Sequence, residues 1–206
     1  MPKSKKKTKN SKIKDSFNIV LMGDSQVGKT SLLERYCLNF FRTEPHEEKT
    51  VVIFKKILEI NKSKYRIKFW DTPCFIDNCD NFKKDMFENS DAIIFVCSYD
   101  IKESLVHINT WYQYVMDFIN IIEKEMILLI NKKDLENDKS LNEEQIIKKS
   151  KDLQLDYYEV SAKTGDNIHN AIINVSQKII DRIKENVSDE EDSENKNKEE
   201  EGCLIF

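Results

Sequence analysis

Residues 17–38 read FNIVLM, then GDSQVGKT, then SLLERYCL. Phe17–Met22 is a continuous apolar run, which is typical of a strand buried on both faces of a parallel sheet. Thr30–Leu38 carries apolar residues at helical intervals, which predicts a helix. Between them, residues 23–30 fit G-x-x-x-x-G-K-S/T, the phosphate-binding loop that joins a strand to a helix. A turn of this composition could arise by chance, but the flanking strand and helix supply the context that the motif requires.

Such a loop binds phosphates through its backbone, because successive N–H groups curl around the anion and the helix N-terminus adds its positive dipole end. Lys29 is expected to reach the β- and γ-phosphates, and the Thr30 hydroxyl is expected to ligate Mg²⁺. The chain has four glycines, and two of them lie in this loop. The expected phosphate-binding residues are Gly23, Asp24, Ser25, Gln26, Val27, Gly28, Lys29 and Thr30. The motif therefore indicates a nucleoside triphosphate with Mg²⁺, without choosing the base.

The rest of the chain alternates strand and helix patterns. Further strands are expected at 51–60, 64–70, 92–97, 126–130 and 157–160, and further helices at 103–122, 141–151 and 167–184. A polar turn at Asn61–Ser63 separates the first two of these strands, which suggests a hairpin. Apolar strands that alternate with helices predict an α/β fold with a mostly parallel sheet covered on both faces.

Two oppositely charged ends flank this body. Residues 1–14 carry seven lysines and no acidic residue, whereas residues 185–206 carry nine acidic residues and two lysines. We therefore expect a disordered lysine-rich arm at 1–16, a globular domain at 17–184 and a flexible acidic tail at 185–206. No apolar run approaches the roughly 18 residues of a membrane-spanning helix. The five cysteines include no C-x-x-C pair, so neither a disulfide framework nor a structural zinc site is expected.

Three later motifs follow predicted strands and bear on the choice of base. Trp70-Asp71-Thr72 ends the strand at 64–70, and Asn131-Lys132-Lys133-Asp134 follows the strand at 126–130. Ser161-Ala162-Lys163 follows the strand that ends at Val160. The carboxyl ends of parallel strands meet at one edge of an open α/β sheet, which is where such sheets bind ligands. We therefore expect these motifs to converge with the phosphate loop.

Taken in order, G-x-x-x-x-G-K-T, W-D-T, N-K-x-D and S-A-K resemble the Ras superfamily of small GTPases, over residues 17–184. Asp100–Ser104 and Ser161–Ile168 look most like the Rab branch. The resemblance implies the P-loop small GTPase fold with a six-stranded sheet, and a monomeric switch that binds GTP or GDP with Mg²⁺. It also implies effector recruitment in vesicle and membrane traffic, on the cytoplasmic face of an intracellular membrane in exchange with the cytosol. A P-loop kinase or ATPase is disfavoured by Asn131–Asp134.

The resemblance assigns roles to residues around the base. Asp134 would accept hydrogen bonds from the N1–H and the exocyclic amine of guanine, a donor pair that adenine lacks. Asn131 would tie the base loop to the phosphate loop. The full set of expected base-binding residues is Phe41, Asn131, Lys132, Asp134, Ser161, Ala162 and Lys163.

The resemblance also implies a magnesium site. Asp71 would hold the ion through water, beside Thr30, and a threonine of the first switch would cap it. Thr50 is the best candidate for that threonine, although it lies farther from the phosphate loop than is usual in the family. Thr43 is the weaker candidate.

The family continues W-D-T with A-G-Q-E, but residues 70–76 read WDTPCFI. Cys74 replaces a glycine whose N–H meets the γ-phosphate, and Phe75 replaces the glutamine that orients the attacking water. We therefore assign no catalytic residue and expect slow hydrolysis. The alternatives are a drifted loop that still switches normally, and a GTP-locked or nucleotide-indifferent scaffold. The departures fall in the two switch regions, about 41–52 and 72–84, through which the family binds exchange factors and effectors.

The last four residues, Cys203–Phe206, fit C-a-a-X, and a terminal phenylalanine favours geranylgeranyl. Cys203 is therefore the expected lipidation site, with a prenyl transferase and a membrane as partners. The acidic neighbours would be repelled by an anionic leaflet, so a second membrane signal is expected, and the lysine arm could supply it. The arm also resembles a nuclear localisation or nucleic-acid patch, or a solubilising tail. It has no aromatic residues to stack on bases, so no nucleic-acid partner is expected.

Overall fold

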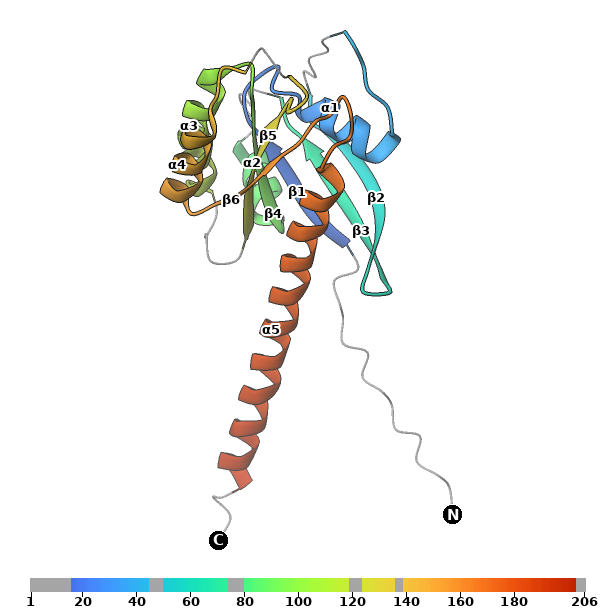
Figure 1. Cartoon of the computed structure of the whole chain (residues 1–206). Coiled ribbons are helices and arrows are strands. Elements are labelled where there is room, and N and C mark those ends of the chain that lie inside the picture. Colours follow the sequence, from blue (N-terminus) through green and yellow to red (C-terminus); the bar gives the residue numbers. More distant parts are fainter. Residues whose placement is uncertain (1–15, 45–49, 74–79, 119–123, 136–138, 203–206) are drawn as a thin grey trace.

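One six-stranded sheet forms the centre of the molecule, with the strands in the order β2-β3-β1-β4-β5-β6 (Figure 1). Neighbouring strands run parallel except β2 and β3, which form the expected antiparallel hairpin. The strands are β1 Ser16–Met22, β2 Val52–Ile60, β3 Ser63–Asp71, β4 Ala92–Ser98, β5 Glu125–Asn131 and β6 Asp156–Glu159. The predicted α/β fold with a mostly parallel six-stranded sheet is confirmed.

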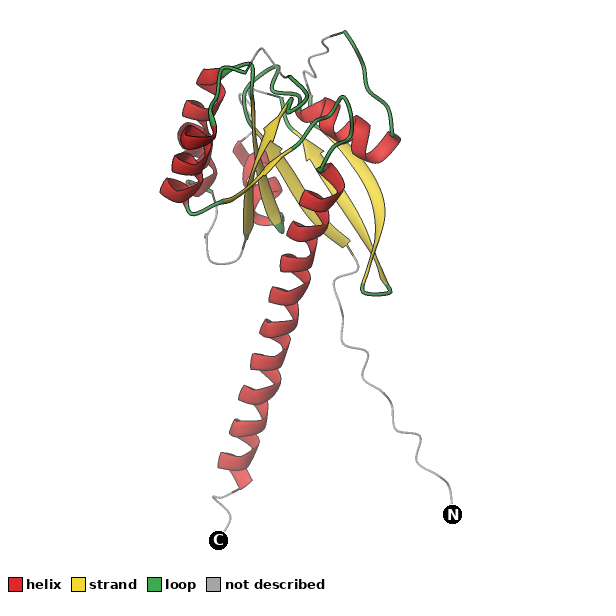
Figure 2. Cartoon of the chain, viewed as in Figure 1, coloured by secondary structure: helices red, strands yellow, loops and turns green. Residues whose placement is uncertain are grey.

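The structure is a computed structural model, and it describes residues 16–44, 50–73, 80–118, 124–135 and 139–202. Helices lie on both sides of the sheet (Figure 2). They are α1 Lys29–Leu33, the π-helical turn η1 Glu34–Leu38, α2 Asp80–Glu88, α3 Lys102–Met116, α4 Glu143–Leu153 and α5 Ile168–Gly202. None of these helices is long and apolar enough to cross a bilayer.

Two hydrophobic cores, one on each face, hold the helices to the sheet. Along β1, Ile19 and Leu21 point into the core shared with α1 and α5. Val20 and Met22 point into the opposite core, shared with α2, α3 and α4. Successive side chains of a strand alternate between its faces, so a strand covered on both faces must be apolar at every position. This is why the continuous run of β1 predicts its position so well.

The strand register brings the sequence motifs to one edge. Leu21 of β1 lies opposite Asp71 of β3, and Ser98 of β4 lies opposite Asn131 of β5. The phosphate loop, the W-D-T motif and the N-K-x-D motif therefore leave the sheet at the same end.

The last helix extends beyond the sequence-based prediction. The sequence predicts a helix over 167–184 and a flexible tail after it, whereas the backbone is helical from Ile168 to Gly202. No glycine or proline occurs from 168 to 201, and the strong helix formers Glu and Lys are frequent there. Acidic composition predicts solvation, but it does not distinguish a solvated helix from a solvated coil. In Figure 1 the end of α5 projects well past the sheet.

Three other elements differ from expectation. The helix expected over 30–38 is α-helical only to Leu33 and continues as the wider turn η1, which ends at Asn39 in a left-handed conformation with φ 52°. α2 is not predicted at all, because its sequence DNFKKDMFE is mostly polar; Met86 and Phe87 are nevertheless buried. α3 ends at Met116, earlier than expected, and residues 119–123 lie outside the described part of the chain.

Candidate nucleotide-binding site

A cavity of about 340 Å³ opens where the motifs converge. Its wall is formed by the phosphate loop with α1, by η1 and the segment that follows it, by the chain after β3, and by the loops after β5 and β6. The sequence-predicted residues in this wall are Ser25, Gln26, Gly28, Lys29, Thr30, Phe41, Asn131, Lys132, Asp134, Ala162 and Lys163. Other predicted site residues do not line the cavity but form hydrogen bonds with residues that do. They are Gly23, Asp24, Val27, Asp71 and Ser161.

The phosphate loop has no room for side chains at its glycines. A Cβ on Gly23 would lie 2.2 Å from the carbonyl oxygen of Val96, and one on Gly28 would lie 2.4 Å from Nδ2 of Asn131. Gly28 also has φ 92°, in the region that favours glycine. Gln26 adopts φ 63° without being glycine. The loop therefore keeps a glycine-like backbone at Gln26 at some cost in strain.

The lysine of the phosphate loop is buried and fixed. Nζ of Lys29 donates hydrogen bonds to the carbonyl oxygens of Gly23 at 2.8 Å and Asp24 at 2.9 Å. A buried ammonium needs such acceptors, because losing water without them is costly. The contacts hold a positive charge in the cavity wall, where it favours an anionic ligand.

Helix α3 holds the phosphate loop from outside. Nε1 of Trp111 donates to one carboxylate oxygen of Asp24 at 2.7 Å, and Nδ1 of His107 lies 2.7 Å from the other. Trp111 and His107 could not be identified from the sequence, because no motif links α3 to the phosphate loop. Only the fold brings them together.

Thr30 and Asp71 fit the expected magnesium ion. Oγ1 of Thr30 donates to Oδ2 of Asp71 at 2.6 Å, and Asp71 is buried at the end of β3. A hydroxyl and a carboxylate are hard oxygen ligands, which Mg²⁺ prefers. Next to them, Oγ1 of Thr72 donates to the carbonyl oxygen of Leu21 at 2.6 Å and so fixes the chain that leaves β3.

Asn131 joins three loops. Its Nδ2 donates to the carbonyl oxygen of Val27 at 2.9 Å, and its Oδ1 accepts from the backbone N–H of Ala162 at 3.1 Å. Asn131 is buried, so these bonds satisfy polar atoms that would otherwise be costly. The link between base loop and phosphate loop that the resemblance implies is present.

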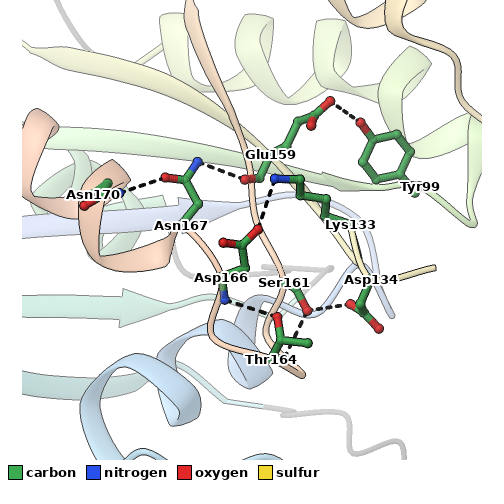
Figure 3. Close-up of polar contacts among 9 residues, drawn as sticks. All are labelled: Tyr99, Lys133, Asp134, Glu159, Ser161, Thr164, Asp166, Asn167 and Asn170. Atoms are coloured by element: carbon green, nitrogen blue, oxygen red, sulfur yellow. Dashed lines mark hydrogen bonds and ion pairs between the residues drawn. The ribbon is translucent and has the colours of Figure 1, made fainter. Parts of the chain in front are cut away.

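Asp134 is oriented by the loop after β6. Oγ of Ser161 donates to its carboxylate, and Ser161 accepts in turn from the backbone N–H of Thr164 at 3.1 Å (Figure 3). Nζ of Lys163 lies 3.9 Å from the same carboxylate, whose side chain is 14% exposed. Asp134 thus presents an oriented, largely desolvated acceptor to the cavity.

Lys132 is positioned by an acidic partner on the chain segment after β4. Its Nζ lies 2.7 Å from Oδ2 of Asp100. Burial raises the pKa of Asp100, but the hydrogen bond and the positive charge of Lys132 act in the opposite direction, and the pKa ends below its ordinary value. The carboxylate therefore stays charged and keeps Lys132 in the cavity wall.

The switch residues are only partly described. Thr43, the weaker candidate for the switch threonine, lies in the cavity wall, whereas Thr50 is exposed before β2. Cys74, Phe75 and Cys203 lie outside the described residues. The expectations about hydrolysis and lipidation therefore rest on the sequence.

Comparison with known proteins agrees with this geometry. The model of the Ras family matches residues 18–181, which include the phosphate loop and both base loops. Ras-related protein Rab-15 of Rattus norvegicus is 31% identical over 166 residues, which cover 80% of this chain and 76% of the relative. Ras-related protein RabG2 of Dictyostelium discoideum is 29% identical, and Ras-related protein Rab-9A of Mus musculus is 26% identical; each match covers 80% of this chain and 83% of the relative. With the cavity, the motifs and these relatives in agreement, the chain belongs to the Ras family and is a Rab-like small GTPase.

Proposed function

We propose that the protein is a guanine-nucleotide switch of Rab type, which alternates between GTP and GDP and recruits effectors in intracellular vesicle and membrane traffic. The observation that carries the proposal is that Lys29, Asn131 and Asp134 share one cavity wall. Lys29 suits the phosphates, Asp134 suits the two donors of guanine, and Asn131 fixes the distance between them. The relatives carry Rab names, and a role in vesicle and membrane traffic is what the resemblance to the Rab branch implies.

Magnesium would be held by Thr30 and Asp71, with a threonine of the segment after η1 as a further ligand. The ion, when bound, neutralises charge on the β- and γ-phosphate oxygens. The chain's own contribution is to bind and orient the phosphates, through Lys29 and the N–H groups of the phosphate loop.

We expect the chain to hydrolyse GTP slowly. Phe75 offers neither a donor nor an acceptor to orient a water, and Cys74 stands where the family has a glycine. If switching is lost altogether, the protein is a GTP-locked or nucleotide-indifferent scaffold. Cys74 and Phe75 are the specific features that favour this second candidate.

Membrane association is part of the same proposal. A prenyl group on Cys203 would anchor the chain to the cytoplasmic face of an intracellular membrane, from which it cycles with the cytosol. One prenyl chain anchors only marginally, so the lysines at 3–14 would add an electrostatic signal. Exchange factors and effectors would bind the monomer through the switch regions, about 41–52 and 72–84.

The test is to identify the nucleotide that purifies with the chain. The protein is isolated with Mg²⁺, denatured, and its released nucleotide is resolved by chromatography. We expect guanine nucleotide at close to one per chain, displaced by added GDP and unaffected by ADP. A chain that carries adenine nucleotide, or that binds GDP and ADP equally, would contradict the proposal.

A further inference from the structure

The π-helical turn η1 holds both segments that flank the base side of the cavity. Its second residue, Arg35, donates from Nε to the carbonyl oxygen of Ala162 at 2.9 Å and from Nη2 to that of Lys163 at 2.6 Å. Two charge-assisted hydrogen bonds from one planar guanidinium fix the backbone of the loop after β6. The position of the Ala162 backbone is thus set from η1 as well as from Asn131.

The same guanidinium reaches the other side of the base site. Its carbon lies 5.9 Å from the centroid of the Phe41 ring, within range of a cation–π contact. Nη1 also donates to Oδ1 of Asn39 at 3.3 Å, which holds the end of η1. Arg35 therefore contacts both Phe41 and the loop after β6.

The residue before Arg35 secures the chain next to Phe41. Oε1 of Glu34 accepts from Nη2 of Arg42 at 2.8 Å, and the Glu34 side chain is only 9% exposed, against 43% for Arg42. A carboxylate that is nearly buried is costly without its partner, so the pair strongly favours one position of Arg42. Both residues lie in the cavity wall.

We propose that Glu34 and Arg35 form a brace that sets how long guanine nucleotide stays bound. The brace consists of Arg35 on Ala162, Lys163 and Phe41, and of Glu34 on Arg42. The brace fixes the segment that carries Phe41 and Arg42 and the loop after β6, and these two segments must separate when a base leaves the cavity. An exchange factor that pulls Arg42 away from Glu34 would release this hold. The inference rests on the proposed function, because it concerns the same nucleotide site.

The experiment measures release of a fluorescent GDP from the full-length chain after addition of excess GDP. Arg35→Ala removes two charge-assisted hydrogen bonds, so we expect release to speed up by about tenfold or more. Arg35→Lys keeps the charge but loses the planar guanidinium that donates to two carbonyl oxygens. Its release rate should therefore lie between those of the wild type and Arg35→Ala. Glu34→Gln keeps the shape but loses the charge, with release about threefold to tenfold faster. Glu59→Gln and Arg66→Gln, exposed on the β2–β3 hairpin, are the matched controls and should release at the wild-type rate.

Two further readouts separate a brace from a general loss of stability. Association rates should change far less than release rates, because the brace acts on a site already closed around its ligand. A double-mutant cycle of Glu34→Gln and Arg42→Gln should show coupling, with the double variant releasing no faster than about the faster single variant.

The outcomes are distinct. Faster release in Arg35→Lys and Glu34→Gln, with little change in association, supports the brace even if Arg35→Ala does not fold. Wild-type release rates in both variants would overturn it while leaving the proposed function intact. Equal effects on association and release, or additive effects in the cycle, would also overturn it. A wild-type chain that binds no fluorescent GDP would overturn both the brace and the proposed function.

Discussion

Asn131 donates a hydrogen bond to the carbonyl oxygen of Val27 at 2.9 Å, although the two residues lie 104 positions apart in the sequence. This bond joins the loop expected to read the base to the loop expected to hold the phosphates. A Cβ at Gly28 would lie 2.4 Å from the same amide nitrogen, so a glycine is needed for the loops to approach this closely. The distance between base and phosphate sites therefore depends on one buried side chain.

Asn131→Ala should lower the free energy of unfolding. The substitution leaves the Val27 carbonyl and the Ala162 N–H without their partner, and we expect a loss of about 2 kcal/mol. Urea unfolding monitored by circular dichroism measures it. Asn170→Ala on the exposed face of α5 is the control, with an expected change under about 0.5 kcal/mol. Equal stability of the two variants would contradict the structural role of Asn131.

Asp134→Asn should change base selectivity. The amide presents a donor where guanine also presents donors, so GDP affinity should fall by about a thousandfold. Xanthosine diphosphate should bind better than GDP, because its 2-oxo group accepts from the new amide. Titration of both nucleotides on this variant and on Asp166→Asn, which lies in the neighbouring loop outside the cavity wall, measures the effect. GDP affinity equal to wild type in Asp134→Asn would show that Asp134 does not contact the base.

The acid dependence of stability should carry a contribution from Asp100. Burial raises its pKa, but the hydrogen bond and the positive charge of Lys132 leave the pKa below the ordinary value. Its charged form is therefore favoured in the folded state. The contribution is fully present above the unfolded pKa of about 3.9 and is lost as the pH falls through the folded pKa.

Comparison of wild type with Asp100→Asn isolates this contribution. The difference in unfolding free energy should be constant between about pH 7 and pH 5 and should shrink below about pH 4. Urea unfolding at several pH values measures it. A difference that grows as the pH falls would contradict the sign derived from the Lys132 contact.

Membrane association should require Cys203. Cys203→Ser removes the thiol that carries the lipid, and the protein should move to the cytosolic fraction on cell fractionation. Cys37→Ser, at a partly buried cysteine of η1, is the control and should remain with membranes. Deletion of residues 3–14 should weaken binding to anionic vesicles without affecting neutral ones, because that attraction is electrostatic. A Cys203→Ser protein that still sediments with membranes would reveal another anchor.

The sequence predicted the elements whose signals are local. β4 from Ala92 to Cys97 and β5 from Met126 to Ile130 are continuously apolar because helices cover both faces of these strands. The phosphate loop has a residue spacing that few other structures require. Both could be located without knowing the fold. The helical run of α5 past Lys184 does not follow from acidic composition, because solvated coils share that composition, although the residues of this run favour a helix.

Much of the site could not be predicted because its contacts are made only by folding. Trp111 reaches Asp24 across 87 positions, and Arg35 reaches Ala162 across 127. Neither belongs to a motif, and a tryptophan or arginine in a helix is ordinarily explained by packing or solvation. The N-K-x-D and S-A-K motifs identify the residues expected to touch the nucleotide, but not those that hold them in place.

We propose that this chain binds GTP in a Ras-family site but hydrolyses it slowly, because Cys74 and Phe75 replace a glycine and a glutamine. The most direct measurement is single-turnover release of phosphate from chains preloaded with GTP and Mg²⁺, compared between wild type, Phe75→Gln, Cys74→Gly and the double variant. We expect phosphate release from the wild type to be much slower than from an ordinary Rab, and Phe75→Gln to restore part of the rate. Because both residues belong to one loop, the double variant should increase the rate by more than the product of the two single increases. A wild-type rate equal to that of an ordinary Rab, with no gain in any variant, would contradict the account.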